Sequence, residues 1–225
     1  AQGNIISPVL ANIYMHNVLT LWFQYIIAKE CKGECFLVVY ADDFIAGFQY
    51  PWEAERFYEQ LRSRMAKFGL ELEENKSRIV ESGRYLASLK AKRGESTRIG
   101  TFDFLGFTFY CGRTTKGNPW IMPKTSSKKF RQKVKEIKIW LYNNKEQKLG
   151  KLMYMLNVKL VGHYRYYGIS FNSRMISNYK QQVRELLYKV LNRRSEKKSY
   201  TREGFIEMMK YYKLVNPKIY YSLFC

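Results

Sequence analysis

The sequence predicts an α+β protein in which a mixed first half is followed by an all-helical second half. Helical periodicity alternates with short apolar runs over residues 1–123, whereas residues 124–225 show helical periodicity alone. The charge changes at the same place: residues 1–123 carry 15 Lys+Arg and 13 Asp+Glu, and residues 124–225 carry 24 and 6. With 225 residues, 46% of them hydrophobic, the chain can bury a sizeable core. We therefore expect two domains, 1–123 and 124–225.

Two helices are expected in the first domain. Residues 9–29, which follow Pro8, have apolar side chains at helical spacing. Residues 51–69 begin with a proline, which suits a first helical turn, and end at Gly69, which suits a helix end.

A β-hairpin is expected between these helices. The apolar runs CFLVVY, at 35–40, and FIAGF, at 44–48, flank Asp42 and Asp43. Aspartate is a favoured turn residue, so the two acids should lie at the tip of the hairpin. Because the flanking runs are strongly apolar, we expect them to be central strands with the acids at the edge of a buried sheet.

The rest of the first domain should contain more strand. Residues 70–80 alternate in polarity and then turn, and 102–110 form a strong strand candidate. A junction is expected around Pro123, which breaks regular structure, and Ser126 or Ser127 should cap the helix that follows.

The second domain should be built from amphipathic helices. Its first helix places Phe130, Val134, Ile137 and Leu141 on one face and Lys and Arg on the other. The last begins at Thr201, a good capping residue. The expected helices cover 127–145, 152–168, 174–194 and 201–212.

The strongly basic composition points to nucleic acid as the partner. The formal net charge is +20 and the pI about 9.8, which favours nucleic acid or an anionic membrane. No apolar run has the roughly 18 residues of a spanning helix, so no membrane is expected. Cys31 and Cys35 are spaced C-x-x-x-C without a matching His or Cys pair, so reduced thiols, and hence a reducing compartment, are favoured over a zinc site.

The acid pair has two interpretations. Asp42 and Asp43 fit an ordinary solvated turn. Adjacent carboxylates held rigidly between apolar strands also suit Mg²⁺, and two such ions could activate a 3′-hydroxyl and stabilise leaving pyrophosphate.

Three further motifs have an ordinary structural reading beside a functional one. The stretch QGNIISP, residues 2–8, is either a capped helix start or a loop whose glycine admits a ligand. Lys76 is either a solvated side chain or a phosphate contact. The segment FLGF, 104–107, is either a buried strand or a strand that also touches a ligand, with Gly106 allowing close approach.

The order of these elements is more specific than any one of them. Q-G-x-x-x-S-P before a long helix, Y-A-D-D in a hairpin, G-L-E-L followed by K-S-R-I-V, and then F-D-F-L-G-F resemble the palm of a reverse transcriptase. The tail, with LNVKLVGHYRYYGI and LLYKVLNRRSEKKSYT, resembles the thumb or maturase region of bacterial group II intron reverse transcriptase/maturases. The resemblance covers essentially the whole chain. It implies a partial palm of antiparallel sheet and packed helices, followed by an all-α thumb/maturase domain.

The resemblance also implies roles for particular residues. Asp42 and Asp43 would be the catalytic, Mg²⁺-binding acids, with Asp42 the direct ligand, and Lys76 would assist pyrophosphate departure. Residues implied to contact nucleotide or template are Gln2, Gly3, Ser7, Pro8, Tyr40 and Ala41. Those implied to form the primer grip are Phe104, Leu105, Gly106 and Phe107. Those implied to bind RNA are Lys124, Lys128, Lys129, Arg131, Lys135, His163, Tyr164, Arg165, Tyr167, Arg193 and Arg194.

The expected activity is RNA-directed DNA polymerisation together with maturase function in the bacterial cytoplasm. The partners would be intron RNA, an RNA template–DNA primer duplex and dNTPs, with two Mg²⁺ ions as cofactors. In this family a third metal-binding Asp lies on a strand before the Q-G motif, so we expect this chain to be a fragment that does not polymerise alone. The alternatives are a splicing-only RNA-binding maturase and a reverse transcriptase of a retron or diversity-generating element.

Overall fold

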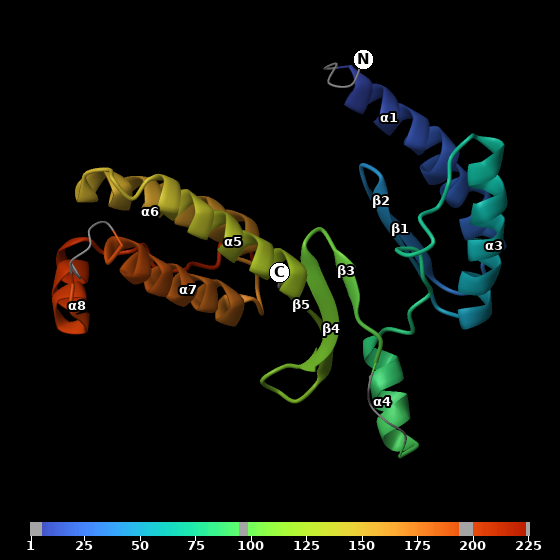
Figure 1. Ribbon diagram of the computed structural model, residues 1–225. Helices are drawn as coiled ribbons and strands as arrows, with labels where there is room; N and C mark the ends of the chain where they lie inside the picture. Colours follow the sequence, from blue (N-terminus) through green and yellow to red (C-terminus); the bar gives the residue numbers. More distant parts are fainter. Residues whose placement is uncertain (1–5, 95–98, 194–199, 224–225) are drawn as a thin grey trace. The chain divides into compact units, whose positions relative to one another are not determined.

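A computed structural model describes residues 6–94, 99–193 and 200–223 of the chain (Figure 1). They form two compact units, residues 1–82 and 83–225. The expected α+β class is confirmed, since small antiparallel sheets and helices precede a helical region. The boundary between the units lies before the second sheet, at residues 102–125. This sheet therefore belongs to the same unit as the C-terminal helices and packs against them.

A long, irregular helix opens the first unit. It comprises α1 (Ser7–Met15), two π-helical turns (His16–Thr20 and Phe23–Ile27) and α2 (Ala28–Glu30). Its central part carries the apolar side chains of the core, and α3 (Pro51–Lys67) packs against them. The core residues are Val18, Leu19, Trp22, Phe23, Ile27, Phe57, Leu61 and Met65.

The expected hairpin is present as β1 (Cys35–Tyr40) and β2 (Asp43–Phe48), paired antiparallel. Its inner face, which includes Leu37, Val39 and Phe44, packs on the helical core. Its outer face does not: Phe36 and Tyr40 are 59% and 63% exposed. The expectation of central strands in a buried sheet was therefore wrong, because this sheet has two strands and covers the core with one face only.

The segment after α3 differs from its expected form. Gly69 follows the helix with φ +65°, which confirms it as the stop. No strand forms between Leu70 and Ser82; a turn at residues 74–76 is the only regular feature there. The alternating pattern of 70–80 instead seats Leu70 and Leu72 against the core.

A three-stranded antiparallel sheet opens the second unit. Its strands, in the order β3-β4-β5, are β3 (Phe102–Phe104), β4 (Phe107–Arg113) and β5 (Pro119–Thr125). The expected single strand over 102–110 is thus a hairpin that turns at Leu105 and Gly106. Pro123 does not break the structure, because β5 is an edge strand, where proline is tolerated. The helix α4 (Arg84–Lys92) was not expected.

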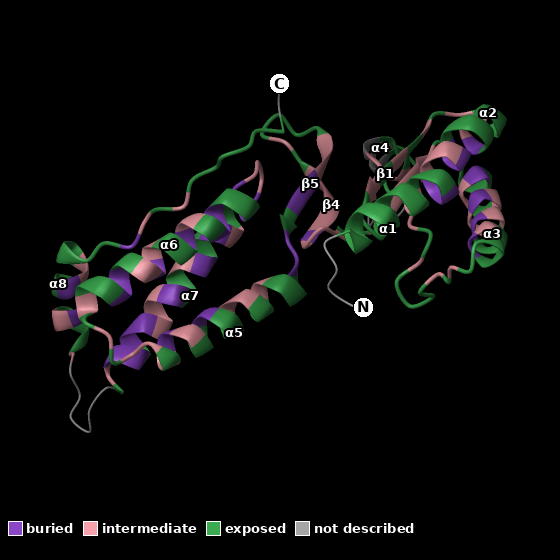
Figure 2. Cartoon of the chain, turned by 90° about the horizontal axis from the view of Figure 1, so that it is seen from above, coloured by how far each residue is buried: buried purple, intermediate pink, exposed green. Residues whose placement is uncertain are grey.

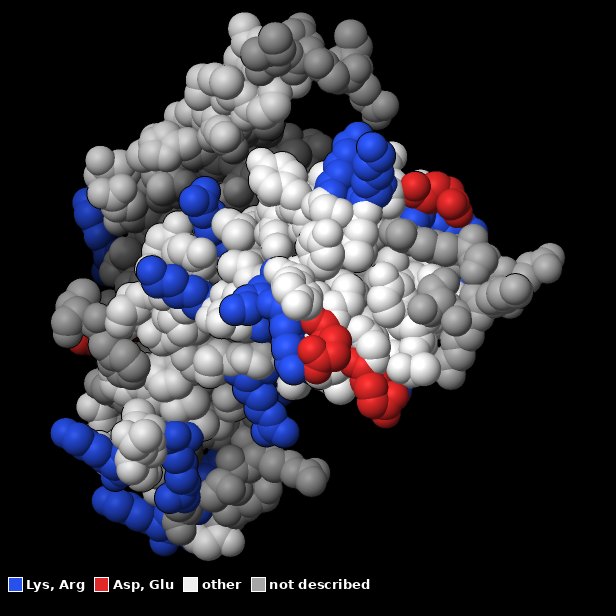
Figure 3. All heavy atoms as spheres, turned by 90° about the vertical axis from the view of Figure 1, so that its left-hand side faces the viewer, with Lys and Arg blue, Asp and Glu red and all other residues white. Residues whose placement is uncertain are grey.

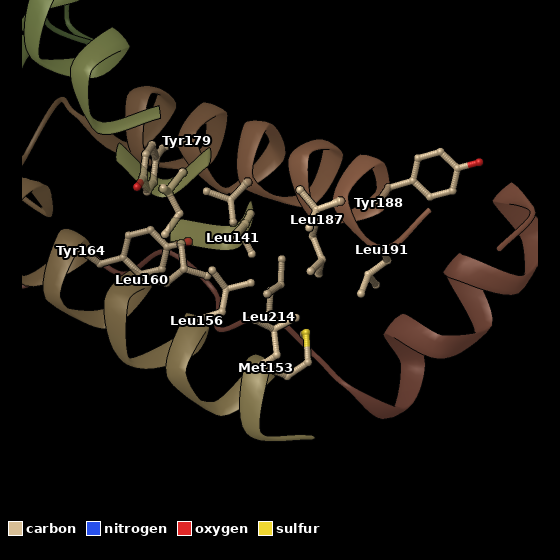
Figure 4. Close-up of a cluster of buried hydrophobic side chains, with 14 of the residues drawn as sticks. Leu141, Met153, Leu156, Leu160, Tyr164, Tyr179, Leu187, Tyr188, Leu191 and Leu214 are labelled. Atoms are coloured by element: carbon tan, nitrogen blue, oxygen red, sulfur yellow. The ribbon is translucent and has the colours of Figure 1, made fainter. Parts of the chain in front are cut away.

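Four helices complete the second unit: α5 (Ser127–Asn143), α6 (Leu149–Tyr167), α7 (Ser173–Leu191) and α8 (Arg202–Tyr211). Ser126 and Thr201 cap α5 and α8 by accepting backbone hydrogen bonds, as expected. Buried residues lie on the facing sides of α5, α6 and α7 (Figure 2). Leu141, Leu156, Leu160, Tyr164 and Leu187 meet in this core (Figure 4).

Two further expectations concern the membrane and the thiols. None of the helices in the described residues is long and apolar enough to cross a membrane. The described cysteines, Cys31, Cys35 and Cys111, are free thiols. Burial, with a contribution from neighbouring Cys35, raises the pKa of Cys31 to about 11, so this thiol stays protonated at neutral pH.

Candidate catalytic hairpin and nucleic-acid interface

The two acids lie at the exposed tip of the β1–β2 hairpin. Tyr40 pairs with Asp43, which leaves Ala41 and Asp42 as a two-residue turn. Ala41 has φ 53°, a left-handed conformation that costs a residue with a Cβ about 1–2 kcal/mol. The six-pair register of the hairpin holds the turn in this shape. Asp43 therefore shares the outer face with Tyr40, while Asp42 projects from the turn itself.

The donor set fits a hard divalent cation. Asp42 and Asp43 are both exposed, and their carboxylates make no hydrogen bond or ion pair with another described residue, so the carboxylate oxygens are open to a ligand. Carboxylate oxygens are what Mg²⁺ prefers. Within the described ranges, no group of three or more His, Cys, Asp or Glu residues lies close enough to hold a metal ion. The hairpin thus offers two of the carboxylates that such a site uses.

The structure describes only part of the QGNIISP motif, residues 2–8. Gln2 and Gly3 lie outside the described residues. Ser7 and Pro8 form the first turn of α1, as expected, with proline in the position it favours.

Lys76 lies in the turn at residues 74–76. Its side chain is 81% exposed, and its Nζ is 4.0 Å from Glu73 Oε2. Such an exposed pair is weak, so the amine remains free to contact a phosphate. The ordinary reading, a solvated lysine, fits the same geometry.

The expected primer-grip residues form a tight turn. Leu105 and Gly106, with φ 50° and 79°, connect Phe104 to Phe107. Glycine adopts this conformation freely, whereas Leu105 bears a cost of about 1–2 kcal/mol. A Cβ on Gly106 would meet the Tyr167 hydroxyl at 3.2 Å, so the turn lies close against α6.

Three residues of α5 that were expected to bind RNA, Lys128, Arg131 and Lys135, share its solvent side with Lys138, which was not predicted. Lys128, Arg131, Lys135 and Lys138 recur at helical spacing, are exposed, and form no ion pair with another described residue. The carboxylate on this helix, Glu136, is engaged by Lys133, whose hydrogen bond lowers its pKa. We call these four residues the α5 basic stripe. Unpaired cations in a row suit a phosphate backbone.

Two other expected cations lie near the start of α5, Lys124 before the helix and Lys129 in its first turn. Lys124, in β5, is exposed with its Nζ 4.9 Å from the centre of the Tyr110 ring. Lys129 is also exposed, and its backbone N–H completes the Ser126 cap.

Three residues expected to bind RNA are buried instead. His163, Tyr164 and Tyr167 are 9%, 0% and 4% exposed. His163 stacks on Tyr179 with ring centroids 3.7 Å apart. Burial, with a smaller contribution from the charge of Lys133, lowers its pKa to about 4, so the ring is neutral at pH 7. These side chains follow the core side of α6, and direct RNA contact by them was a wrong expectation.

The solvent side of α6 carries Arg165, which was expected to bind RNA and is exposed, together with residues that were missed. Tyr154, Val158 and Tyr166 are 71%, 55% and 55% exposed. Gly162 lies between Val158 and Tyr166 in the sequence, and no atom of the described residues lies within 4 Å of the position that a Cβ would take there. Glycine inside a helix costs about 1 kcal/mol relative to alanine, and packing does not explain it here. We call this set the α6 outer face; its members are Lys151, Tyr154, Val158, Gly162, Arg165 and Tyr166. The same periodicity that identifies the core of α6 would have identified it.

Just after the end of α7, Arg193 donates a hydrogen bond to the Tyr142 hydroxyl at 2.6 Å. It is exposed, whereas Arg194 lies outside the described residues. On the face drawn in Figure 3, Lys and Arg side chains are far more widespread than Asp and Glu, as the composition requires.

Comparison with known families agrees with this arrangement. A family model described as reverse transcriptase (RNA-dependent DNA polymerase) matches residues 1–109, which contain the acid hairpin. One described as group II intron, maturase-specific domain matches residues 127–212, which contain α5 to α8. A search of curated proteins gave no match.

The chain is thus a member of the reverse transcriptase class by its first part. The maturase-specific domain that follows places it more narrowly, in the group II intron reverse transcriptase/maturase family.

Proposed function

We propose that this chain carries part of the active site and the thumb of an RNA-directed DNA polymerase encoded by a group II intron. The protein would copy RNA into DNA from dNTPs and would also bind its intron RNA to assist splicing. The observation that carries the proposal is the exposed Asp42–Asp43 pair at the tip of the hairpin. The turn there is strained at Ala41 and is held in place by the paired strands. Strain of this kind is common at functional sites.

In the proposed mechanism, Asp42 and Asp43 would hold Mg²⁺, with Asp42 as the direct ligand. When bound, the metal would supply charge neutralisation at the attacking 3′-hydroxyl and the leaving pyrophosphate. Family resemblance implies a third carboxylate on a palm strand N-terminal to Gln2. Lys76, exposed in its turn, places a cation or a proton at the departing phosphates.

The remaining palm residues orient the substrates. Tyr40 presents an exposed ring next to Asp43, where it lines the space for the nucleotide and primer end. The turn of Phe104 to Phe107 contacts the primer. Gln2, Gly3, Ser7 and Pro8 contact template and incoming nucleotide.

Two surfaces of the helical unit contact nucleic acid in this proposal. The α5 basic stripe neutralises backbone phosphates, and Lys124, Lys129 and Arg193 extend this contact. The α6 outer face presents aromatic and apolar side chains around Gly162, where a duplex can approach the helix backbone closely.

A primer-extension experiment on an RNA template tests the proposal. It uses a polypeptide that contains this chain and the preceding palm strand, as wild type and Asp42→Ala, with intron splicing measured on the same preparations. We expect Asp42→Ala to abolish extension and to leave splicing intact. Equal extension by the two proteins would refute the metal-ligand role.

A splicing-only maturase is the second candidate. It is favoured by the match of residues 127–212, which contain α5 to α8, to the maturase-specific domain. Splicing by a wild-type protein that extends no primer would establish this alternative.

A further inference from the structure

The turn of the β3–β4 hairpin is held by the helical region as well as by its own strands, which pair Phe104 with Phe107. Its backbone carbonyls both accept hydrogen bonds from the helical region: the Tyr166 hydroxyl donates to Leu105 O at 3.0 Å, and Ser126 N–H donates to Gly106 O at 2.9 Å. The ring of Phe107, the first residue after the turn, stacks on Tyr166 with centroids 6.0 Å apart and 12° between planes. Since Leu105 is strained, these contacts keep it in its left-handed conformation.

The side-chain amide of Asn172 connects β5 to the same helices, and both its oxygen and its nitrogen have hydrogen-bond partners. Asn172, with no exposed surface, accepts from Thr125 N–H at 2.8 Å and donates to Thr125 Oγ1 and Tyr167 O at 2.9 and 2.8 Å. It thus links the last residue of β5 to the last residue of α6. The sheet and the C-terminal end of α6 form one rigid joint.

Tyr166 differs from the rest of this joint because it also faces solvent. Its side chain is 55% exposed and follows Val158 and Gly162 at four-residue intervals on the α6 outer face. The ring of Tyr166 is therefore part of the surface that we propose binds nucleic acid. Its hydroxyl contacts the turn that we propose binds the primer.

We propose that Tyr166 is a positioning residue, which couples the seating of a duplex on α6 to the placement of the Leu105–Gly106 turn at the primer 3′ end. The coupling rests on the proposed polymerase function. Duplex contact with the ring of Tyr166 fixes the direction of its hydroxyl, and the hydroxyl fixes the strained turn. Sequence alone gave no sign of this link, because 61 residues separate its two ends.

The first test is a double-mutant cycle in primer extension with a polypeptide containing this chain and the preceding palm strand. Tyr166→Phe keeps the ring and removes the hydroxyl, so we expect kcat to fall by roughly 2- to 10-fold, the effect of one neutral hydrogen bond, with duplex Kd unchanged. Leu105→Gly removes the strain that the bond opposes. We expect Tyr166→Phe to have a smaller effect in that background.

Tyr211→Phe is the matched control, since Tyr211 is 85% exposed on α8 and its hydroxyl has no hydrogen bond with another described residue. Equal effects of Tyr166→Phe with and without Leu105→Gly would overturn the coupling, as would a loss confined to duplex Kd.

A second measurement does not depend on polymerisation. Hydrogen exchange of the 225-residue chain should speed up at residues 104–108 in Tyr166→Phe and stay unchanged in α7. Unchanged exchange at the turn would overturn the positioning role. Failure of the polymerase proposal would instead show as an inactive wild type with the exchange difference intact.

Discussion

The imidazole of His163 stacks on the phenol of Tyr179, with ring centroids 3.7 Å apart and an angle of 15° between the planes. The contact joins α6 to α7 inside the helical core, where burial disfavours the charged form of the imidazole. Its consequence is a pH-dependent stability in a region that had been expected to bind RNA.

We expect the helical unit to lose stability as the pH falls from about 6.5 to about 4. The folded-state pKa of His163 is about 4, below the ordinary value of 6.5, so the unfolded chain binds the proton more readily in this window. Full stability is present above pH 6.5, and up to about 3 kcal/mol is lost at pH 4. Urea unfolding at pH 7 and 4.5 measures the difference. His163→Phe should reduce the difference, and an unchanged difference would contradict the assignment.

Asn172→Ala should lower the free energy of unfolding by about 2–4 kcal/mol. The substitution leaves the buried Thr125 N–H and Tyr167 carbonyl without their partner, and each unsatisfied group costs about 1–3 kcal/mol. Denaturant unfolding measures the loss, and the control is Asn178→Ala, at an exposed position on α7, the helix that Asn172 precedes. A loss no larger than that of the control would show that the amide does not hold the joint.

Glu53→Ala should destabilise the first unit by about 2 kcal/mol, and Glu53→Gln much less. Glu53 is 1% exposed, and its Oε1 accepts from the backbone N–H groups of Lys32 and Gly33 at 2.6 and 3.3 Å. Gln keeps an acceptor oxygen, whereas Ala leaves two donors unsatisfied beneath the hairpin. Thermal unfolding of the two variants gives the comparison, and equal losses would refute the hydrogen-bond explanation.

Lys128→Gln and Lys135→Gln should each weaken binding of a template–primer duplex and reduce the salt dependence. Each phosphate contact contributes roughly one to the slope of log K against log salt. Filter binding or fluorescence anisotropy at several salt concentrations measures the slope. Lys210→Gln is the control, because that lysine is paired with Glu207 on α8. A slope unchanged by both stripe substitutions would remove the α5 basic stripe from the interface.

Local patterns predicted much of the fold. The acid hairpin, the stop at Gly69 and the caps at Ser126 and Thr201 each depend on a few adjacent residues, and all were predicted from the sequence. The single strand over 102–110 was wrong because Leu105 is a poor turn residue by itself, and its conformation depends on Tyr166.

The candidate site was predicted less evenly. Two adjacent acids between apolar runs identify the tip of the hairpin. To predict which residues of α6 are buried, each residue must be assigned to a face of the helix, and a run of consecutive residues cannot be assigned as a whole. His163, Tyr164 and Tyr167 were chosen as part of such a block, and Tyr166, on the exposed side, was missed. The Asn172–Thr125 bonds join residues 47 apart and left no local pattern to recognise.

The most direct test of the account is the single-turnover rate of one dNTP incorporation at saturating template–primer. The measurement compares Asp42→Asn with wild type in a polypeptide that contains this chain and the preceding palm strand. We predict that duplex Kd is unchanged and that the rate falls by at least about 100-fold, since Asn preserves the shape of the turn and removes the charge that binds Mg²⁺. A rate equal to that of wild type would contradict the assignment of the hairpin tip as the catalytic site.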